Sequence, residues 1–268
     1  MASTLLRLHA AVREAVARAP ADDRPAGGPN PKGDIPRRFD LVAEELARDF
    51  LAREFGDGII LSEESGESHF GSGEPRHLFL LDPVDGSDNH ARGLPLSSVS
   101  VAILPAGGPL APGAVLWAIV GGLEEDVPLL AGRGSGAWRG EERLRSSDVR
   151  QVEKAFLSCE LNHFSPPPAL GSLLGRARAV RSFGCASRAI ALVASGALDA
   201  HIDVRGRLTP ESFYAAALIL EEAGGCLVDP AGKPLGKAEG ITHRSRLIAA
   251  ATPALAREIV EALGDGSF

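Results

Sequence analysis

Two short apolar runs in the first third of the chain each end directly at acidic residues. Residues 58–62 read Gly-Ile-Ile-Leu-Ser and precede Glu63, and residues 78–81 read Leu-Phe-Leu-Leu and precede Asp82. Apolar runs of this length, bounded by turn residues, are typical of buried strands. If the two strands lie side by side, Glu63, Asp82 and Asp85 meet at one edge of a sheet. The chain must therefore cover a sheet on both faces and still keep a cluster of carboxylates at its edge.

The rest of the chain alternates helical and strand patterns. Apolar residues at helical spacing predict helices over residues 3–19, 36–55, 187–195, 210–223 and 252–264. Further short apolar runs predict strands over residues 99–104, 114–120, 127–131, 155–160, 177–181, 199–204 and 246–251. Residues 20–33 are rich in proline and glycine and predict a loop. The density of short strands indicates a sheet meander, and the alternation with helices predicts an α/β layered fold, an α+β sandwich.

The length of 268 residues is enough for one large core or for two closely packed halves. We predict an N-terminal α+β half over residues 1–150, which carries the acidic cluster. An α/β half over residues 151–268 completes the chain, and the two halves pack as one unit.

Composition limits the partners and the compartment. The net charge is -7 without a basic stripe, and aromatic residues make up 5%, so nucleic acid is not an expected partner. No apolar run approaches the roughly 18 residues of a membrane span, and the N-terminal residues lack the pattern of a secretory signal. Cys159, Cys185 and Cys226 are too scattered for a disulfide framework or a zinc site. We therefore predict a cytoplasmic protein with free thiols and no membrane partner.

The acidic cluster has the composition of a site for a hard cation. No Lys or Arg lies between Leu78 and Arg92, so the local sequence supplies no counter-ion for these carboxylates. Oxygen-only ligands suit Mg²⁺ rather than zinc. A proline after Asp82 stiffens the turn, so that Asp82 and Asp85 can face inward and the Val84 carbonyl can serve as a further ligand.

Gly86 and Ser87 follow at the predicted start of a helix, where exposed N–H groups can bind a phosphate. A metal site next to an anion site is the arrangement that metal-assisted phosphoryl hydrolysis needs. The alternative is an ordinary surface turn, because Asp, Pro and Gly are all favoured turn residues.

Further motifs decide between these alternatives. They are Asp82-Pro83-Val84-Asp85-Gly86-Ser87-Asp88-Asn89, Ser62-Glu63-Glu64-Ser65, Gly134-Ser135-Gly136-Ala137, Arg181-Ser182-Phe183-Gly184, Glu222-Ala223-Gly224-Gly225, and Asp34 with Asp40. Taken in chain order, these elements span about residues 34–250, and together they resemble the inositol monophosphatase family, which includes the archaeal-type fructose-1,6-bisphosphatases. The resemblance implies alternating helix and sheet layers, a homodimer, and a Mg²⁺-dependent phosphatase, with Mn²⁺ possible, that hydrolyses a small sugar or polyol phosphate.

The resemblance also implies the metal ligands. Glu63, Asp82 and the Val84 carbonyl would hold one Mg²⁺, Asp82 and Asp85 would hold a second, and Glu63 would help to place a third through waters. The family has one more metal-ligating Asp, ten residues before the Glu of its Glu-Ala-Gly-Gly motif, where this chain has Ser212. Ser212 is a neutral and poor ligand, so a weakened second site is expected. Its neighbour Glu211 is one helix step away, which turns a side chain by about 100°.

The remaining roles concern catalysis and substrate. By resemblance, Asp40 with Ser87 would orient and deprotonate the attacking water, and Glu63 would join them as a catalytic residue. The N–H groups of Gly86 and Ser87 would hold the phosphate. Asp203 would bind substrate hydroxyls, or it is an ordinary acid at a strand end.

Two readings of the function stay open at this point. The first is a working phosphatase with a remodelled second metal site, acting on an inositol phosphate or a fructose 1,6-bisphosphate type of substrate. Arg205 and Arg207 could then meet a second phosphate, unless they are ordinary exposed loop residues. The second is a catalytically weak relative that binds a sugar phosphate or a protein partner.

Overall fold

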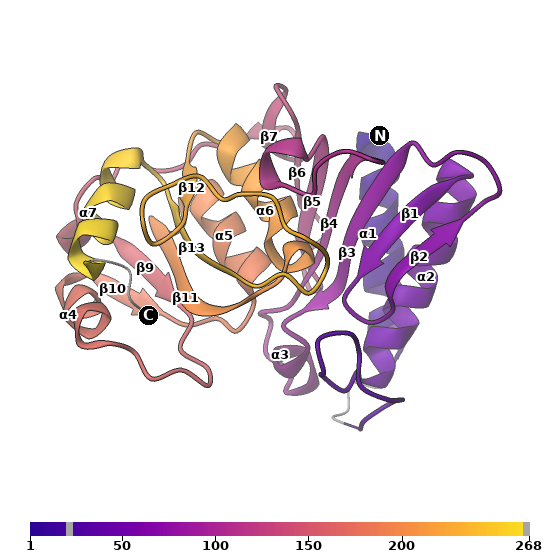
Figure 1. Ribbon diagram of the computed structural model, residues 1–268, viewed down its shortest axis with the longest axis horizontal. Helices are drawn as coiled ribbons and strands as arrows, with labels where there is room; N and C mark the ends of the chain where they lie inside the picture. The colour runs from indigo at the N-terminus through magenta and orange to yellow at the C-terminus, as the bar shows by residue number, and fades with distance from the viewer. Residues whose placement is uncertain (20–23, 265–268) are drawn as a thin grey trace.

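Two β-sheets with helices packed on them make up the computed structural model, which describes residues 1–19 and 24–264 (Figure 1). The first sheet has eight strands in the order β2-β1-β3-β4-β5-β6-β7-β8. Their bounds are β1 Gly58–Ser62, β2 Gly66–Phe70, β3 His77–Asp85, β4 Ser98–Pro105, β5 Trp117–Gly122, β6 Leu129–Gly132, β7 Gly136–Arg139 and β8 Glu142–Arg143. From β3 to β8 consecutive strands pair antiparallel, which is the predicted meander.

The second sheet has five strands in the order β10-β9-β11-β13-β12. Their bounds are β9 Phe156–Cys159, β10 Ala179–Arg181, β11 Ala200–Leu208, β12 Cys226–Val228 and β13 Ser245–Ala250. The helices are α1 Ala2–Arg18, α2 Arg38–Phe55, α3 Ser87–Ala91, α4 Pro168–Arg176, α5 Ala186–Ala194, α6 Pro210–Glu222 and α7 Pro253–Leu263, with short 3-10 turns at Pro112–Ala114 and Val152–Lys154.

Helix and sheet layers alternate through the molecule, as the sequence predicts. Helices α1 and α2 cover the outer face of the first sheet, α5 and α6 lie between the two sheets, and α4 and α7 cover the outer face of the second (Figure 1). Three clusters of buried apolar side chains fill the spaces between these layers. The helices of these layers bury apolar side chains against the sheets, and this burial is the main force that holds such layers together.

Helix α6 contributes most to the packing between the sheets. Ten of its side chains, from Glu211 to Leu220, are buried, because the helix contacts strands of both sheets at once. A helix that is buried on all sides shows little amphipathic pattern. Its first turn begins at Thr209 and Pro210, beside the acidic end of β3.

The two predicted strands that precede the acids do lie side by side. Strands β1 and β3 pair parallel, with Ser62 opposite Leu81, and the N–H of Glu63 donates to the Leu81 carbonyl at 3.3 Å. Parallel strands end at the same edge of a sheet. Glu63 and Asp82 are therefore neighbours at this edge.

Several elements were not predicted. Strands β2, β7, β8 and β12 are short, and β2 is an edge strand with three polar residues. Helix α4 begins at the last of three consecutive prolines and contains two glycines, which hide its pattern, although Leu170 and Leu173 are buried on it. Proline in the first turn is compatible with a helix because its missing N–H would have no helical partner there.

The predicted loop over residues 20–33 is seen only in part. Residues 20–23 lie outside the described residues, and residues 24–33 form turns with an isolated bridge between Pro25 and Arg37. The predicted division at residue 150 falls between β8 and β9, and the two halves stay a prediction. Over residues 1–19 and 24–264, the helices are too short or too polar to cross a bilayer.

Candidate active site

A polar cavity of about 580 Å³ opens where the acidic ends of β1 and β3 meet α3, the start of α6 and the loop before α2. Most of the predicted site residues line it, namely Asp40, Glu63, Asp82, Val84, Asp85, Gly86, Ser87, Arg205 and Ser212. Asp203 is absent from this lining. The tertiary structure thus brings together residues that lie up to about 170 positions apart in the sequence.

A β-bulge sets the directions of the two aspartates on β3. Asp82 pairs with Ser100 and Asp85 pairs with Ser98, so three steps on β3 face two steps on β4. An extra residue of this kind bends a strand and re-aims its side chains. Asp82 and Asp85 both reach the cavity for this reason, although they are separated by two residues.

Asp82 has a buried oxygen that needs a positive partner. Its residue is 1% exposed, and its Oδ1 has no hydrogen-bond partner among the described residues. Burial raises the pKa of Asp82 well above its usual value, and the charges of Glu63 and Asp85 raise it further. A buried carboxylate is tolerated when it is paired or bound to a cation. This oxygen is the observation that best fits a metal ion.

The remaining predicted metal ligands do not point at a common centre. Among the described residues, no three His, Cys, Asp or Glu side chains converge closely enough to hold a metal ion. Asp85 is turned toward α5, where its Oδ2 accepts hydrogen bonds from Ser187. The Ser212 hydroxyl makes only long contacts of 3.4 Å with Thr209 and Glu211. Glu63, Asp82 and Val84 line one cavity, and a cation held by their oxygens stays a prediction; Asp85 and Ser212, as these side chains lie, do not fit a second cation.

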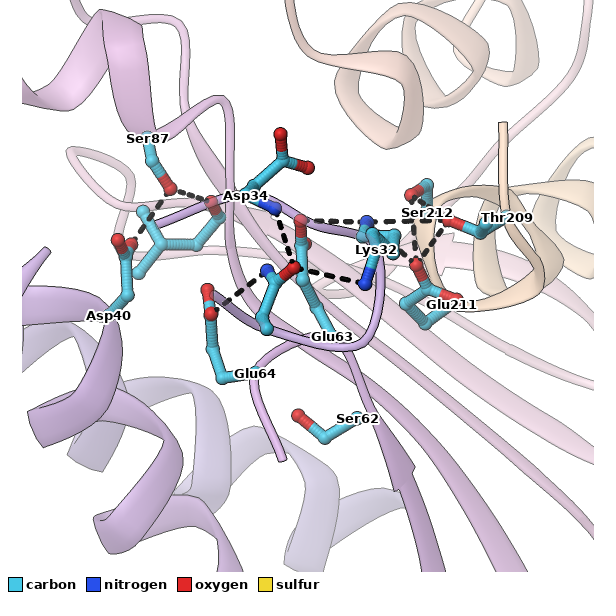
Figure 2. Close-up of polar contacts among 12 residues, drawn as sticks. Lys32, Asp34, Asp40, Ser62, Glu63, Glu64, Ser87, Thr209, Glu211 and Ser212 are labelled. Atoms are coloured by element: carbon cyan, nitrogen blue, oxygen red, sulfur yellow. Dashed lines mark hydrogen bonds and ion pairs between the residues drawn. The ribbon is translucent and has the colours of Figure 1, made fainter. Parts of the chain in front are cut away.

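Lys32 supplies a counter-ion that the local sequence lacks. Its Nζ lies 2.7 Å from Oε1 of Glu63 and 2.9 Å from Oε1 of Glu211, as Figure 2 shows. Burial lowers the pKa of Lys32, but the charges of Glu63 and Glu211 outweigh burial and raise the pKa above its usual value. Lys32 therefore stays protonated within the acidic cluster.

Glu211 is a further residue of the site that the sequence argument set aside. A turn of about 100° between successive helical residues suggested that its side chain points away, but its carboxylate lies fully buried beside Lys32. Burial raises the pKa of Glu211, and the charge of Lys32 opposes that shift. Thr209 also donates its hydroxyl to Glu211, which holds the carboxylate inward. An acid in the first turn of an otherwise apolar helix is the one sequence signal that could have identified it.

Asp40 and Ser87 form the predicted pair (Figure 2). The Ser87 hydroxyl shares its proton between Oδ1 of Asp40 at 2.7 Å and the Val84 carbonyl at 2.8 Å. The other Asp40 oxygen accepts from the backbone N–H of Arg37 at 2.8 Å. Burial raises the pKa of Asp40 to about 6, although the hydrogen bonds from Arg37 and Ser87 lower it. The pair thus places a weak base near neutrality inside the cavity.

Asp203 lies behind the cavity wall and holds Arg205, which lines the cavity. It is fully buried on β11, and its two oxygens accept from Nε of Arg205 at 3.0 Å and from Nη2 at 2.7 Å. Arg205 itself lines the cavity, so Asp203 fixes the guanidinium there. Direct contact of Asp203 with a substrate hydroxyl stays a prediction. The cavity lining also includes polar residues that the sequence argument did not identify, namely Asn30, Lys32, Arg37, Glu64, Glu160, Asn162 and His163.

Comparisons with known proteins identify the family of this chain. The profile of the inositol monophosphatase family matches residues 4–266. A fructose-1,6-bisphosphatase/inositol-1-monophosphatase of Thermococcus kodakarensis is 30% identical over 89% of this chain and 86% of its own length. Nus factor SuhB of Salmonella typhimurium strain LT2 is 29% identical over 74% of this chain and 73% of its own.

Solved structures support the same relationship. The inositol monophosphatase of Thermotoga maritima superposes with a TM-score of 0.78 at 25% identity, covering 98% of this chain and 96% of that one. The predicted fold class, the family and the enzyme class are all confirmed. This chain therefore belongs to the inositol monophosphatase family of phosphoric monoester hydrolases.

Proposed function

We propose that this protein is a Mg²⁺-dependent phosphomonoesterase that hydrolyses a small sugar or polyol phosphate, with Mn²⁺ as an alternative ion. One cavity carries the proposal. It is shared by the pair of Asp40 and Ser87 and by the Asp82 oxygen that has no hydrogen-bond partner among the described residues. An oxygen-rich cation site beside a weak base matches metal-assisted phosphoryl hydrolysis. The family is metal-dependent, which supports the same assignment.

A divalent cation held by Glu63, Asp82 and the Val84 carbonyl would acidify a bound water and neutralise phosphate oxygens. Ser87 and Asp40 would then accept the proton that the attacking water releases. The Ser87 hydroxyl, which donates to Asp40 at 2.7 Å, can accept a hydrogen bond from the attacking water, and Asp40 can receive the proton. A base with a pKa of about 6 is largely ionised at neutral pH and is still basic enough to take that proton.

The start of α3, at Gly86 and Ser87, is the proposed phosphate-binding site. Gly86 and Ser87 line the same cavity as Glu63 and Asp82, so we expect their backbone N–H groups to bind the phosphate. Gly86 has a φ of +85°, and an added Cβ would lie 3.0 Å from the Leu96 carbonyl oxygen. Glycine therefore permits this tight turn beside the cavity.

The cationic side chains of the cavity favour a substrate that carries more than one anionic group. Arg37, Arg205 and Arg207 all line it, and Asp203 fixes the guanidinium of Arg205. Guanidinium groups are well suited to phosphate oxygens. They favour a substrate with a second anionic group, of the fructose 1,6-bisphosphate type, and an inositol phosphate is the alternative. The double name of the Thermococcus relative supports both.

A panel of phosphate esters with Mg²⁺ tests the proposal. We expect release of phosphate from fructose 1,6-bisphosphate or an inositol phosphate, no turnover in excess chelator, and no turnover for Asp82→Asn. Asp49→Asn, the same change at an exposed position on α2, is the control and should behave as the parent. Full turnover in excess chelator would overturn the metal dependence. Binding of the esters without any hydrolysis would favour the weak relative, a reading that the similarity to a Nus factor also keeps open.

The assembly and the compartment belong to the same proposal. We infer from the sequence a homodimer in the cytoplasm that has neither nucleic acid nor a membrane as its partner. Light scattering on the purified chain tests the dimer, since a monomer at micromolar concentration would contradict it.

A further inference from the structure

Lys32 is held in place by three acceptors from both halves of the chain. Its Nζ reaches Glu63 at 2.7 Å on the first sheet, and Glu211 at 2.9 Å and Thr209 Oγ1 at 3.3 Å at the start of α6. An ammonium group has three N–H donors, so these contacts use its full capacity. The side chain is only 11% exposed, which places a fixed positive charge inside the acidic cluster.

The Asn30 side chain stabilises the loop that carries Lys32. The Asn30 Oδ1 accepts from the N–H of Lys32 at 3.0 Å and of Asp34 at 2.9 Å, and its amide donates to Glu64 at 3.2 Å. An Asn side chain that bonds to the backbone two residues on stabilises a tight turn. The turn directs the Lys32 side chain toward Glu63, as Figure 2 shows.

The buried Glu211 carboxylate needs a nearby positive charge, and Lys32 supplies it. Its side chain is fully buried, and its Oε2 has no hydrogen-bond partner among the described residues. A buried carboxylate without a nearby cation is strongly destabilising. Ser212, the next residue, is neutral, so the first turn of α6 brings its negative charge to Lys32 through Glu211.

We propose that Lys32 acts as a built-in cation on the α6 side of the cluster and takes the place of one metal ion there. Lys32 uses one Glu63 oxygen, and its charge opposes the entry of a divalent ion between Glu63 and Ser212. Glu63, Asp82 and the Val84 carbonyl remain for a metal on the other side. The inference deepens the proposed function, on which it rests, because it predicts fewer bound metal ions than the three that the family resemblance implies.

Equilibrium binding of Mn²⁺, followed by the EPR signal of the free ion, tests this without any turnover. The full-length parent is compared with Lys32→Gln. The variant should bind one more Mn²⁺, or bind its weakest Mn²⁺ about tenfold or more tightly, because a unit charge a few ångströms from a divalent ion has a large effect at a partly buried site. Lys154→Gln removes the same charge from an exposed position and should leave Mn²⁺ binding unchanged.

Lys32→Gln leaves Glu211 buried without its cation and could fail to fold. The double variant Lys32→Gln/Glu211→Gln removes both charges, and it should also show the tightened Mn²⁺ site because Glu63 regains both oxygens. Unchanged or weaker Mn²⁺ binding in either folded variant would overturn the inference. Mn²⁺ binding of the expected pattern in a chain that hydrolyses no phosphate ester would overturn the proposed function and leave the role of Lys32 standing.

Discussion

Ser187 donates both its backbone N–H and its hydroxyl to Oδ2 of Asp85, at 2.7 and 2.5 Å. Asp85 ends β3 in the first sheet, and Ser187 lies in the first turn of α5 in the layer between the sheets. Burial raises the pKa of Asp85 to about 6, although the two bonds from Ser187 oppose that shift. The contact ties α5 to the acidic edge and sets how far Asp85 can turn toward a cation.

We expect Ser187→Ala to destabilise the protein at neutral pH. Loss of the hydroxyl removes one bond to a buried carboxylate, a cost of about 1–3 kcal/mol. The bond favours the ionised form, so the loss should be largest where Asp85 is ionised in both proteins, well above the parent pKa of about 6, and should shrink as the pH falls through that pKa. Urea unfolding at pH 7.5 and pH 5 measures both values. Ser195→Ala, at the other end of α5, is the control, and an equal loss at both pH values would contradict the role of Asp85.

Asp40→Asn should lower kcat by about 10²-fold or more with little change in KM, the usual scale for the loss of a general base. In the parent, kcat should fall as the pH drops through about 6, because protonation of Asp40 removes the base. Steady-state kinetics across pH 5–8 measures both effects. A change confined to KM would show instead that Asp40 contacts the substrate.

Gly86→Ala should destabilise the protein by about 1–3 kcal/mol and raise KM. The residue has a φ of +85°, and an added Cβ would lie 3.0 Å from the Leu96 oxygen and 3.1 Å from the Cys185 Cβ. Gly93→Ala is a matched control, because Gly93 has a φ of +71° with nothing within 4 Å of an added Cβ. Thermal unfolding separates steric clash from backbone strain. Equal losses in the two variants would argue against a close approach at Gly86.

Glu64→Gln should remove part of the pH dependence of stability in the metal-free protein. Burial, followed by the charges of Glu63 and Asp40, raises the pKa of Glu64 to about 8 from 4.5. The folded state therefore holds a proton that the unfolded state releases above about 4.5, so this contribution is present at low pH and is lost as the pH rises toward 8. The parent should lose stability between pH 5 and pH 8.

Glu64→Gln should flatten that trend and raise the unfolding free energy at pH 8 by about 1–2 kcal/mol. Denaturant unfolding with chelator present is the measurement. Glu67→Gln, at an exposed position on β2, serves as the control. A Glu64→Gln protein with the same slope against pH as the parent would show that Glu64 is ionised throughout.

The elements that frame the site follow from local sequence. The apolar runs before Glu63 and Asp82 form β1 and β3, because apolar periodicity reflects which backbone segments must be buried. The family also follows from local motifs, since a turn such as the one from Asp82 to Ser87 needs specific residues in succession. The absence of an acid at position 212 is likewise visible in the sequence.

The charge pairing of the site was decided by the tertiary structure alone. Lys32 and Glu211 are 179 residues apart and meet at 2.9 Å, and no local pattern relates them. Asp203, expected at the substrate, is buried behind Arg205, and Asp85 is drawn to Ser187. The physical reason is that helical and strand patterns depend on neighbours along the chain, whereas the partner of a buried charge depends on which layers pack together. The Asn30 turn and the two-sided burial of α6 bring Lys32 to Glu211.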